Sequence, residues 1–208
     1  MPNITAPALS FPARSFPAAQ AGTPAGAMGE LSVSELLGKY ATLVKSQKVF
    51  YTSAIITAPV IFSTAGQLGP MIWNRTGSGL DAHILAVSVG SPTTASTVAG
   101  AISYASNTQP TQPTTATALT VTNAYSSGGS SQMFAFSTAT ILVAPTNVPF
   151  PLFAVNTGAI TTGSLTSCFV DLGGMFVVPP GNVGYVCGNA TLTAGVFTIG
   201  VLWAELPS

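Results

Sequence analysis

The only histidine of this chain lies two residues from an aspartate, in a segment whose apolar pattern predicts a β-strand. In LDAHILAVSV, residues 80–89, Asp81 and His83 have the spacing that places both side chains on one face of a strand. Such a pair could act as a general base and its orienting carboxylate. Acid–base catalysis needs further partners, which the sequence does not supply, so we favour a polar pair at a subunit contact or a strand edge.

The other candidates for catalytic chemistry are scattered along the chain. Three carboxylates could serve glycoside hydrolysis, Asp81, Asp171 and Glu205, but no local motif joins them. Cys168 and Cys187 do not form a C-x-x-C pair. Each lies in an apolar run where a free cysteine packs as a small hydrophobe, and a disulfide between them is the alternative. The sequence contains no phosphate-binding loop and no G-x-S-x-G motif. We therefore expect no catalytic residue, no metal site and no cofactor.

Charge is scarce and unevenly distributed. Ten of the 208 residues are charged, or 5%, against about 25% in an ordinary soluble protein. Six of the ten lie within the first 48 residues: Arg14, Glu30, Glu35, Lys39, Lys45 and Lys48. A folded body with so few charges lacks the mixed charged surface of a free monomer, which predicts that much of its surface is covered in a homo-oligomer.

The composition also argues against several classes of partner. The net charge is zero and no basic patch alternates with aromatic residues, so we expect no binding to nucleic acid. No run of about 18 apolar residues is present, which argues against a membrane-spanning helix. The N-terminus has neither the basic region nor the apolar region of a signal peptide, which predicts a protein made and used in a cytoplasm.

Residues 1–30 are rich in Pro, Ala, Gly and Ser, with isolated large apolar residues between them. Repeated prolines favour extended backbone and forbid a regular helix. We expect an extended N-terminal arm that attaches to another protein through apolar side chains: Leu9, Phe11, Phe16 and Met28. A loose tail is the alternative that the composition supports equally.

Residues 31–48 contain the one convincing helical pattern. Ser32 and Glu35 form a capping box, and apolar residues follow at helical spacing. Gly38 weakens the helix by about 1 kcal/mol relative to Ala, so the helix needs a surface to pack against. The residues expected to pack on that surface are Leu36, Tyr40, Leu43 and Val44.

From residue 49 to 208, short runs of Val, Thr, Ile and Phe alternate with Gly, Pro, Asn and Ser. This pattern predicts strands at residues 49–57, 69–74, 80–90, 97–105, 116–123, 132–143, 149–155, 165–178, 183–188 and 191–204. So many strands with almost no helix favour an all-β, jelly-roll-like β-sandwich that serves as the oligomerisation domain.

Two segments of this region are predicted to be exposed loops, and four of its residues are candidates for the oligomer interface. Residues 106–115 are rich in Pro, Thr and Gln, and residues 125–132 form a Gly/Ser loop that we expect to be flexible. Tyr and Trp are enriched at protein interfaces. The interface candidates are Trp73, His83, Tyr185 and Trp203.

Four short motifs together resemble one group of viral proteins. They are GELSVSELLGKY at residues 29–40, WNRTGSG at residues 73–79, VPPG at residues 178–181 and WAELP at residues 203–207. This combination is similar to virion structural proteins of tailed phages and environmental viruses. The resemblance implies a structural protein of the virus particle, assembled in the host cytoplasm.

Composition and resemblance favour a capsid decoration, or cement, protein. We expect an oligomer, most simply a trimer, that the N-terminal arm anchors on the major capsid protein or another virion protein. Apolar burial does not weaken with salt, so such a subunit would hold a shell together across ionic strengths. A tail-fibre, tail-spike or head-fibre protein that binds a host-surface receptor is the alternative, and its aromatic- and Ser/Thr-lined loops at residues 104–115 and 123–132 could contact sugars. A carbohydrate-active enzyme on the same fold is less favoured, because carboxylates are so few.

Overall fold

The computed structural model of the chain describes residues 39–57, 61–66, 69–90, 100–144, 149–155, 168–189 and 196–208. The chain divides between Ser46 and Gln47, and every described strand belongs to the second part, Gln47–Ser208. The residues predicted to anchor the N-terminal arm lie outside the described residues: Leu9, Phe11, Phe16 and Met28.

The described part of the first unit contains one short helix, α3 (Ala41–Lys45). Tyr40 occupies its N-cap position, and Tyr40, Leu43 and Val44 are half-buried, whereas Leu36 lies outside the described residues. The helix ends at residue 45 rather than at the predicted boundary of 48, because Gln47 adopts a left-handed conformation (φ 61°) that an α-helix cannot continue.

The second part contains eleven described strands, and each overlaps a range predicted from the sequence. The predicted strand at 116–123 is divided in two by residues 120–121. The strands are β1 (Val49–Thr57), β2 (Met71–Asn74), β3 (Leu80–Val89), β4 (Gly100–Thr108), β5 (Thr114–Leu119), β6 (Thr122–Asn123), β7 (Phe134–Thr140), β8 (Phe150–Val155), β9 (Cys168–Val178), β10 (Asn182–Gly188) and β11 (Val196–Pro207).

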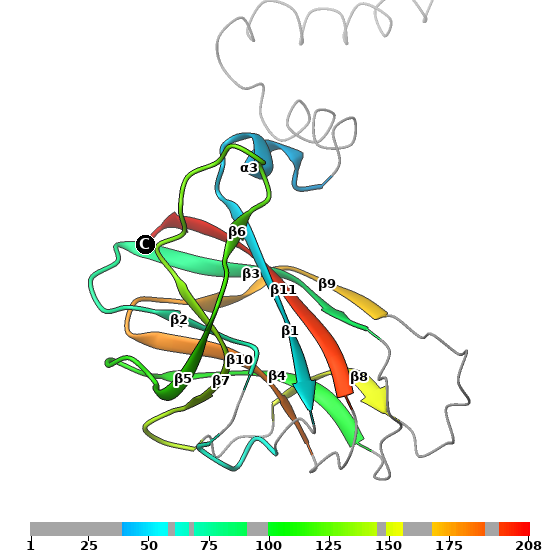
Figure 1. Ribbon diagram of the computed structural model, residues 1–208. Coiled ribbons are helices and arrows are strands. Elements are labelled where there is room, and N and C mark those ends of the chain that lie inside the picture. The colour runs from blue at the N-terminus through cyan, green and yellow to red at the C-terminus, as the bar shows by residue number, and fades with distance from the viewer. Residues whose placement is uncertain are drawn as a thin grey trace, which may run out of the picture. The chain divides into compact units, whose positions relative to one another are not determined.

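The strands form two antiparallel sheets with the connectivity of a jelly roll (Figure 1). Sheet A has the order β6-β1-β11-β3-β9, and sheet B has the order β5-β7-β2-β10-β4-β8. Apart from β5, β6 and β7, the strands form nested pairs: β1 pairs with β11, β2 with β10, β3 with β9 and β4 with β8. This nested pairing is that of an antiparallel ribbon rolled into a sandwich, so the predicted jelly-roll fold is confirmed.

The strands β5, β6 and β7 are an insertion between β4 and β8. β5 and β7 extend sheet B beside β2, whereas β6 extends sheet A beside β1. The insertion, drawn in green in Figure 1, therefore crosses from one sheet to the other at the side of the sandwich opposite β8 and β9. At the crossing the Thr52 hydroxyl donates to the Thr120 carbonyl (2.9 Å), and Leu119 and Val121 pack against the core.

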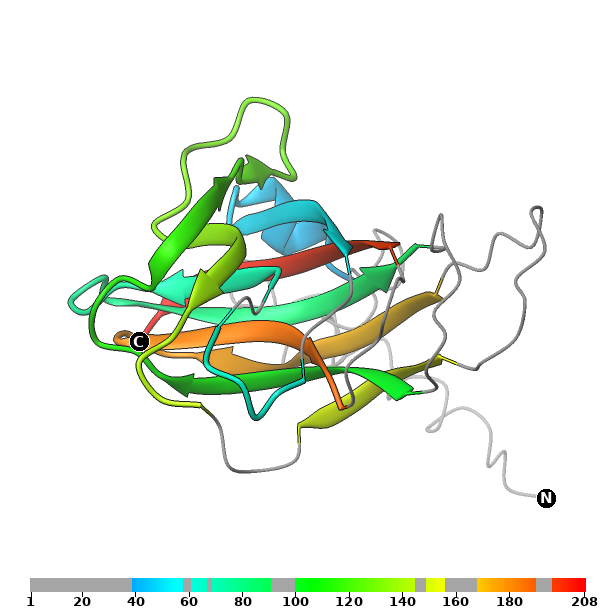
Figure 2. The same ribbon diagram turned by 60° about the horizontal axis from the view of Figure 1, so that its bottom comes forward.

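The core between the sheets is built from alternate residues of each strand. Along β11, Phe197, Ile199, Val201 and Trp203 all point inward and are almost completely buried, as the two-residue period of a strand requires. The Trp203 ring stacks on Phe50 of β1 with its centroid 6.2 Å away. Figure 2 shows the two layers, with β11 in red above β10 in orange.

The outer face of sheet B is covered by the chain itself at β2 and β10. On β2 and β10 the residues that point away from the core, among them Trp73, Tyr185 and Cys187, form a second apolar cluster with Phe136 of β7. Residues 61–66 pack against this cluster, and backbone hydrogen bonds join them to β10 and to the chain that follows β7. β2 and almost all of β10 are therefore buried on both faces.

A buried asparagine joins two turns at one end of the sandwich. The side-chain amide of Asn74 donates to the carbonyls of Leu80 (2.7 Å) and Val178 (2.8 Å). Two motifs of the sequence, residues 73–79 and 178–181, are thus bound to each other. They hold the ends of β2, β3 and β9 together, which gives both motifs a structural role.

Candidate functional site

The structure places three of the four predicted interface residues inside the protomer. Tyr185 and Trp203 have no exposed area, and Trp73 is 8% exposed. Trp203 lies in the core between the sheets, and the other two lie in the second apolar cluster, on the outer face of sheet B. The prediction of an interface at these three residues is wrong, because other parts of the same chain already cover them.

His83 and Asp81 lie on the side of β3 that faces away from the core, as their spacing predicts. Asp81 accepts a hydrogen bond from the Ser208 hydroxyl (3.1 Å). His83 is half-buried beside β9, where a Cβ added to Gly174 would lie 3.7 Å from the His83 Cβ. Each residue therefore has its own surroundings, and His83 is the one interface candidate that keeps an accessible side chain.

The three carboxylates of the body do not face one another: Asp81 and Asp171 lie far apart on β3 and β9, and Glu205, which pairs with the neighbour of Asp81, lies on the opposite face of the sheet. Asp171 on β9 pairs with Ala86 of β3, five residues along that strand from Asp81, which separates the two carboxylates by about 15 Å. Glu205 is buried, 2% exposed. A glycosidase needs two carboxyl groups that face each other across about 5–10 Å, and Asp81 and Asp171 are farther apart than that. Among the described residues, no three His, Cys, Asp or Glu side chains gather in the way that a metal site requires.

The two cysteines are free, so the alternative of a disulfide is excluded. Cys187 lies in the covered cluster of sheet B, where burial raises the pKa of its thiol to about 12. Such a thiol is protonated at neutral pH and behaves as a small apolar group. Cys168 is half-buried at the start of β9.

The outer face of sheet A carries apolar side chains that remain exposed. Ile55 of β1 is 71% exposed and Phe169 of β9 is 66% exposed. We call this surface the open face. It consists of Ile55 and of two rows of residues that pair across β1, β11, β3 and β9. The first row is Tyr51, Leu202, Ala86 and Asp171, and the second row is Ser53, Gly200, Ser88 and Phe169. The small side chains at its centre leave a depression of about 230 Å³ between Tyr51 and Phe169.

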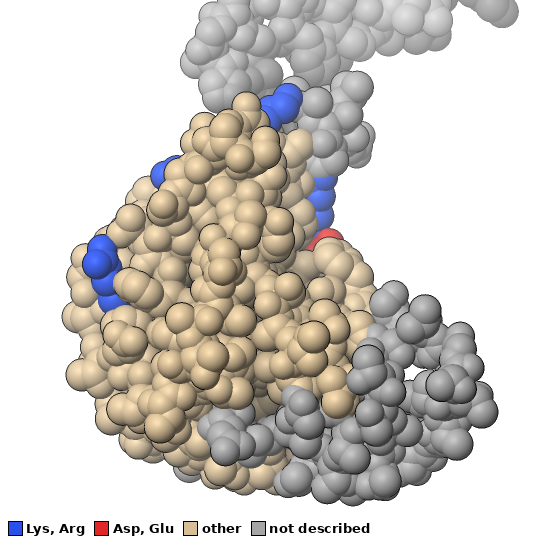
Figure 3. Space-filling view, in the orientation of Figure 1, with Lys and Arg blue, Asp and Glu red and all other residues tan. Residues whose placement is uncertain are grey.

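Charged groups are almost absent from the surface of the body. After residue 48 the sequence contains only Arg75, Asp81, Asp171 and Glu205, and Glu205 is buried. On the face of the molecule in Figure 3, blue and red occur only as small separate patches in a neutral surface. Asp171 is the single charge on the open face, and it accepts a hydrogen bond from the Gly173 N–H (2.9 Å).

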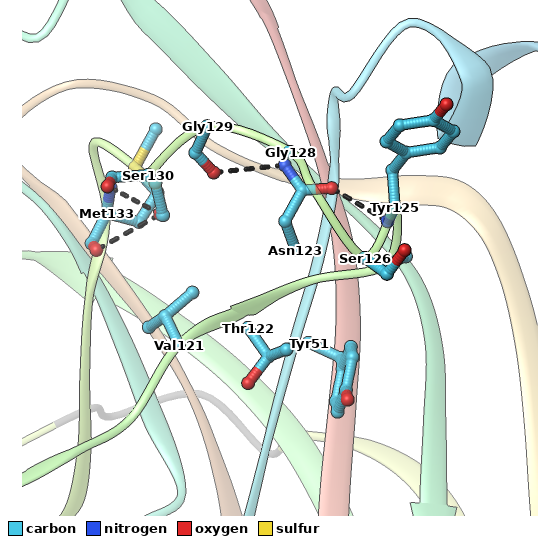
Figure 4. Close-up of a pocket in the computed structure, with 12 residues that line it drawn as sticks. Tyr51, Val121, Thr122, Asn123, Tyr125, Ser126, Gly128, Gly129, Ser130 and Met133 are labelled. Atoms are coloured by element: carbon cyan, nitrogen blue, oxygen red, sulfur yellow. Dashed lines mark hydrogen bonds between the residues drawn. The ribbon is translucent and has the colours of Figure 1, made fainter.

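A pocket of about 610 Å³ lies between β1, β6 and the loop of the insertion, residues 124–131 (Figure 4). Tyr51 and Tyr125 line it with rings that are 44% and 40% exposed. Within the part of the chain that the structure describes, no charged residue lines the pocket. Its other lining residues include four with side-chain hydroxyls: Thr122, Ser126, Ser130 and Ser131. We call this feature the loop pocket.

Asn123 fixes the start of the loop. Its Oδ1 accepts from the Tyr125 N–H (2.8 Å), and its side-chain amide donates to the carbonyls of Gly129 (3.1 Å) and Gln47 (3.0 Å). Figure 4 shows the bonds to Tyr125 and Gly129. A Cβ added to Gly128 would lie 2.3 Å from the Asn123 side chain, so the close approach of this loop requires glycine.

Glu205 of β11 fixes the end of the loop. Its buried carboxylate accepts hydrogen bonds from the Ser131 hydroxyl, from the Gln132 N–H (3.0 Å) and from the Trp203 Nε1–H (3.2 Å). Hydrogen bonds to a charged group each contribute about 1.5–3 kcal/mol. The Gly/Ser loop is exposed, as predicted, but the half-buried Asn123 holds its start and the buried Glu205 holds its end.

Sequence reasoning missed the open face. It identified residues 123–132 as a loop that could contact sugars, but it did not find that Tyr51 of β1 lines a pocket with this loop. Tyr51, Ser53 and Ile55 alternate with core residues along β1. The large side chains of Tyr51 and Ile55 at outward positions were a sequence signal for an exposed apolar face. The anchoring role of Glu205 had no such signal, because its partners in the loop, Ser131 and Gln132, lie more than 70 residues earlier in the chain.

The fold and these surfaces define a jelly-roll protein with an inserted three-strand segment that carries a fixed loop. Comparison of the chain with protein families, with characterised proteins and with solved structures finds no match. No helix in the described part of the chain is both long and apolar enough to cross a membrane.

Proposed function

We propose that this chain is a structural protein of a virus particle, a capsid decoration protein that assembles with copies of itself through the open face. The fold alone does not select this function, because jelly rolls serve capsids and lectins alike. The observation that supports the proposal is an apolar sheet face, with large side chains more than 60% exposed, on a body that has almost no surface charge.

Contact between copies at the open face is favoured by the side chains it presents. Removing Ile55 or Phe169 from water contributes about 1.5–3 kcal/mol for each side chain. The free-energy cost of removing charged groups from water is small at this contact, because Asp171 is the only charged residue in the two rows. The depression around Gly200 and Ser88 offers space for an apolar side chain of a second copy.

In this proposal the oligomer is a trimer and residues 1–30 attach it to the major capsid protein. The apolar side chains of Leu9, Phe11 and Phe16 carry the attachment, and the mixed charges nearby contribute little, since exposed ion pairs are each worth about 0–1 kcal/mol. Molar salt should therefore leave the protein on particles, whereas Phe11→Ser combined with Phe16→Ser should release it. Release by salt, with the double variant still bound, would refute this mode of attachment.

Sedimentation of the full chain at micromolar concentration tests the assembly. The expected result is a trimer that Ser88→Lys converts to a monomer, because the lysine would place a charge in the centre of the open face. Gln112→Lys is the matched control: it adds the same charge at an exposed loop position and should leave the trimer intact. A monomeric wild-type protein, or equal effects of the two variants, would overturn the proposal.

A tail-fibre, tail-spike or head-fibre protein that binds a host-surface receptor is the second candidate. The loop pocket favours it, because two exposed tyrosines and several hydroxyls on a fixed loop are suited to ligand binding. Densitometry of purified particles separates the two candidates. A decoration protein should be present in fixed ratio to the major capsid protein, whereas a fibre should be present in few copies.

A further inference from the structure

We propose that the loop pocket binds a neutral saccharide. This inference goes beyond the assembly function, because the pocket is built by the insertion and β1 within one protomer and shares only Tyr51 with the open face. Its volume, about 610 Å³, lies in the range of small-molecule sites.

The side chains of the pocket match the two kinds of surface that a sugar ring presents. A sugar ring has an apolar face of C–H groups and a rim of hydroxyls. Tyr51 and Tyr125 offer exposed aromatic faces with a hydroxyl at the tip of each ring. Ser126, Ser130 and Thr122 add hydroxyls that can both donate and accept hydrogen bonds.

The absence of charge at the pocket selects a neutral ligand. None of its described lining residues is charged, and the nearby carboxylate of Glu205 is buried and accepts hydrogen bonds from three donors. Arg75 donates to the Gln132 side chain (2.8 Å) and does not line the pocket. No described residue of the lining is a cation that could pair with a phosphate-bearing or acidic ligand, and a neutral sugar does not need one.

The loop is held in place before any ligand arrives. Asn123 binds the backbone on both sides of the loop tip, and Glu205 binds residues 131 and 132. Preorganisation of this kind lowers the ordering cost of binding, which is large for an unrestrained Gly/Ser segment. The two anchors make a loop of small residues suitable as a binding wall.

Saturation-transfer NMR on the full chain tests the inference with the methyl glycosides of glucose, galactose, mannose and N-acetylglucosamine, and with maltose and lactose. At least one of these sugars should receive saturation, and glucuronic acid should receive none. Tyr125→Ala should weaken binding by about tenfold or more, whereas Tyr125→Phe should weaken it less because the ring is kept. Phe150→Ala is the matched control: it removes a similarly exposed ring from the opposite edge of the sandwich and should leave binding unchanged.

The outcomes separate this inference from the assembly proposal. The Ser88→Lys variant should bind the same sugar as the wild-type protein, since Ser88 does not line the loop pocket. Three results would each overturn the inference, whatever the oligomeric state. They are that the folded protein transfers saturation to no sugar, that Tyr125→Ala binds the sugar as well as the wild-type protein does, or that glucuronic acid binds better than the neutral sugars.

Discussion

The outer faces of the two sheets carry similar side chains but differ in what covers them. On sheet B, Trp73, Tyr185 and Cys187 are buried in a cluster against which residues 61–66 pack. On sheet A, Ile55 and Phe169 are more than 60% exposed. Both faces depart from the polar outer surface that an antiparallel sheet usually has. The difference shows that an apolar outer face can be buried by other parts of the same chain or left exposed for contact with another surface.

This comparison separates two kinds of stability. Substitutions on the covered face of sheet B should act on the free energy of unfolding, because their contacts form when one chain folds. Substitutions on the open face should act on association, because their contacts form between chains. The predictions below test this separation from the largest expected effect to the smallest.

Trp73→Ala should lower the free energy of unfolding by about 3–5 kcal/mol. The substitution removes a large ring from the covered cluster and also the hydrogen bond from Trp73 Nε1 to the Gln109 carbonyl (2.8 Å). Urea unfolding followed by circular dichroism measures the change. A loss below about 1 kcal/mol would show that residues 61–66 do not cover this face in solution.

Raising the pH from 7.5 to 10 should lower the free energy of unfolding by about 2 kcal/mol through Cys187. Burial raises the pKa of this thiol to about 12 in the folded protein. Above about pH 8.5 the unfolded chain therefore loses its thiol proton while the folded chain keeps it, and stability falls as the pH rises. The variant Cys187→Ala should show a correspondingly weaker pH dependence. Identical slopes for the two proteins would argue against a buried thiol.

Tyr185→Phe should raise the free energy of unfolding by about 1 kcal/mol. The Tyr185 hydroxyl is buried and has no hydrogen-bond partner in the described structure, and burial also raises its pKa. Phenylalanine keeps the ring and removes the unpaired polar group. Thermal unfolding of both proteins at pH 7 measures the change, and a destabilised variant would reveal a hydrogen-bond partner of the hydroxyl.

Phe169→Ala should change the free energy of unfolding of the dilute protein by less than about 0.5 kcal/mol. The side chain is 66% exposed on the open face, so the folded monomer loses few contacts. The same variant should weaken self-association at micromolar concentration, and 1 M NaCl should not, because apolar contact is not screened. A strong effect on unfolding at low concentration would place Phe169 among the residues that stabilise a single chain.

Much of the fold was predictable because its signals are local. Gly, Pro, Asn and Ser separate the apolar runs, and each described strand overlaps a predicted range. The candidate site was not predictable in the same way. Trp73, Tyr185 and Trp203 were assigned to an interface on residue type, and residue type does not tell whether a ring is covered by its own chain or by a partner. The viral role, the trimer and the attachment of the arm stay predictions.

By itself the sequence determined the β-rich character of the body, the approximate strand positions and the scarcity of charge, since each depends on composition or on neighbours along the chain. The tertiary structure decided which strands pair, which outer face is covered and how the loop is held. Glu205 illustrates the reason: its hydrogen-bond partners Ser131 and Gln132 are more than 70 residues away in sequence, and only the folded sheet brings them to one carboxylate.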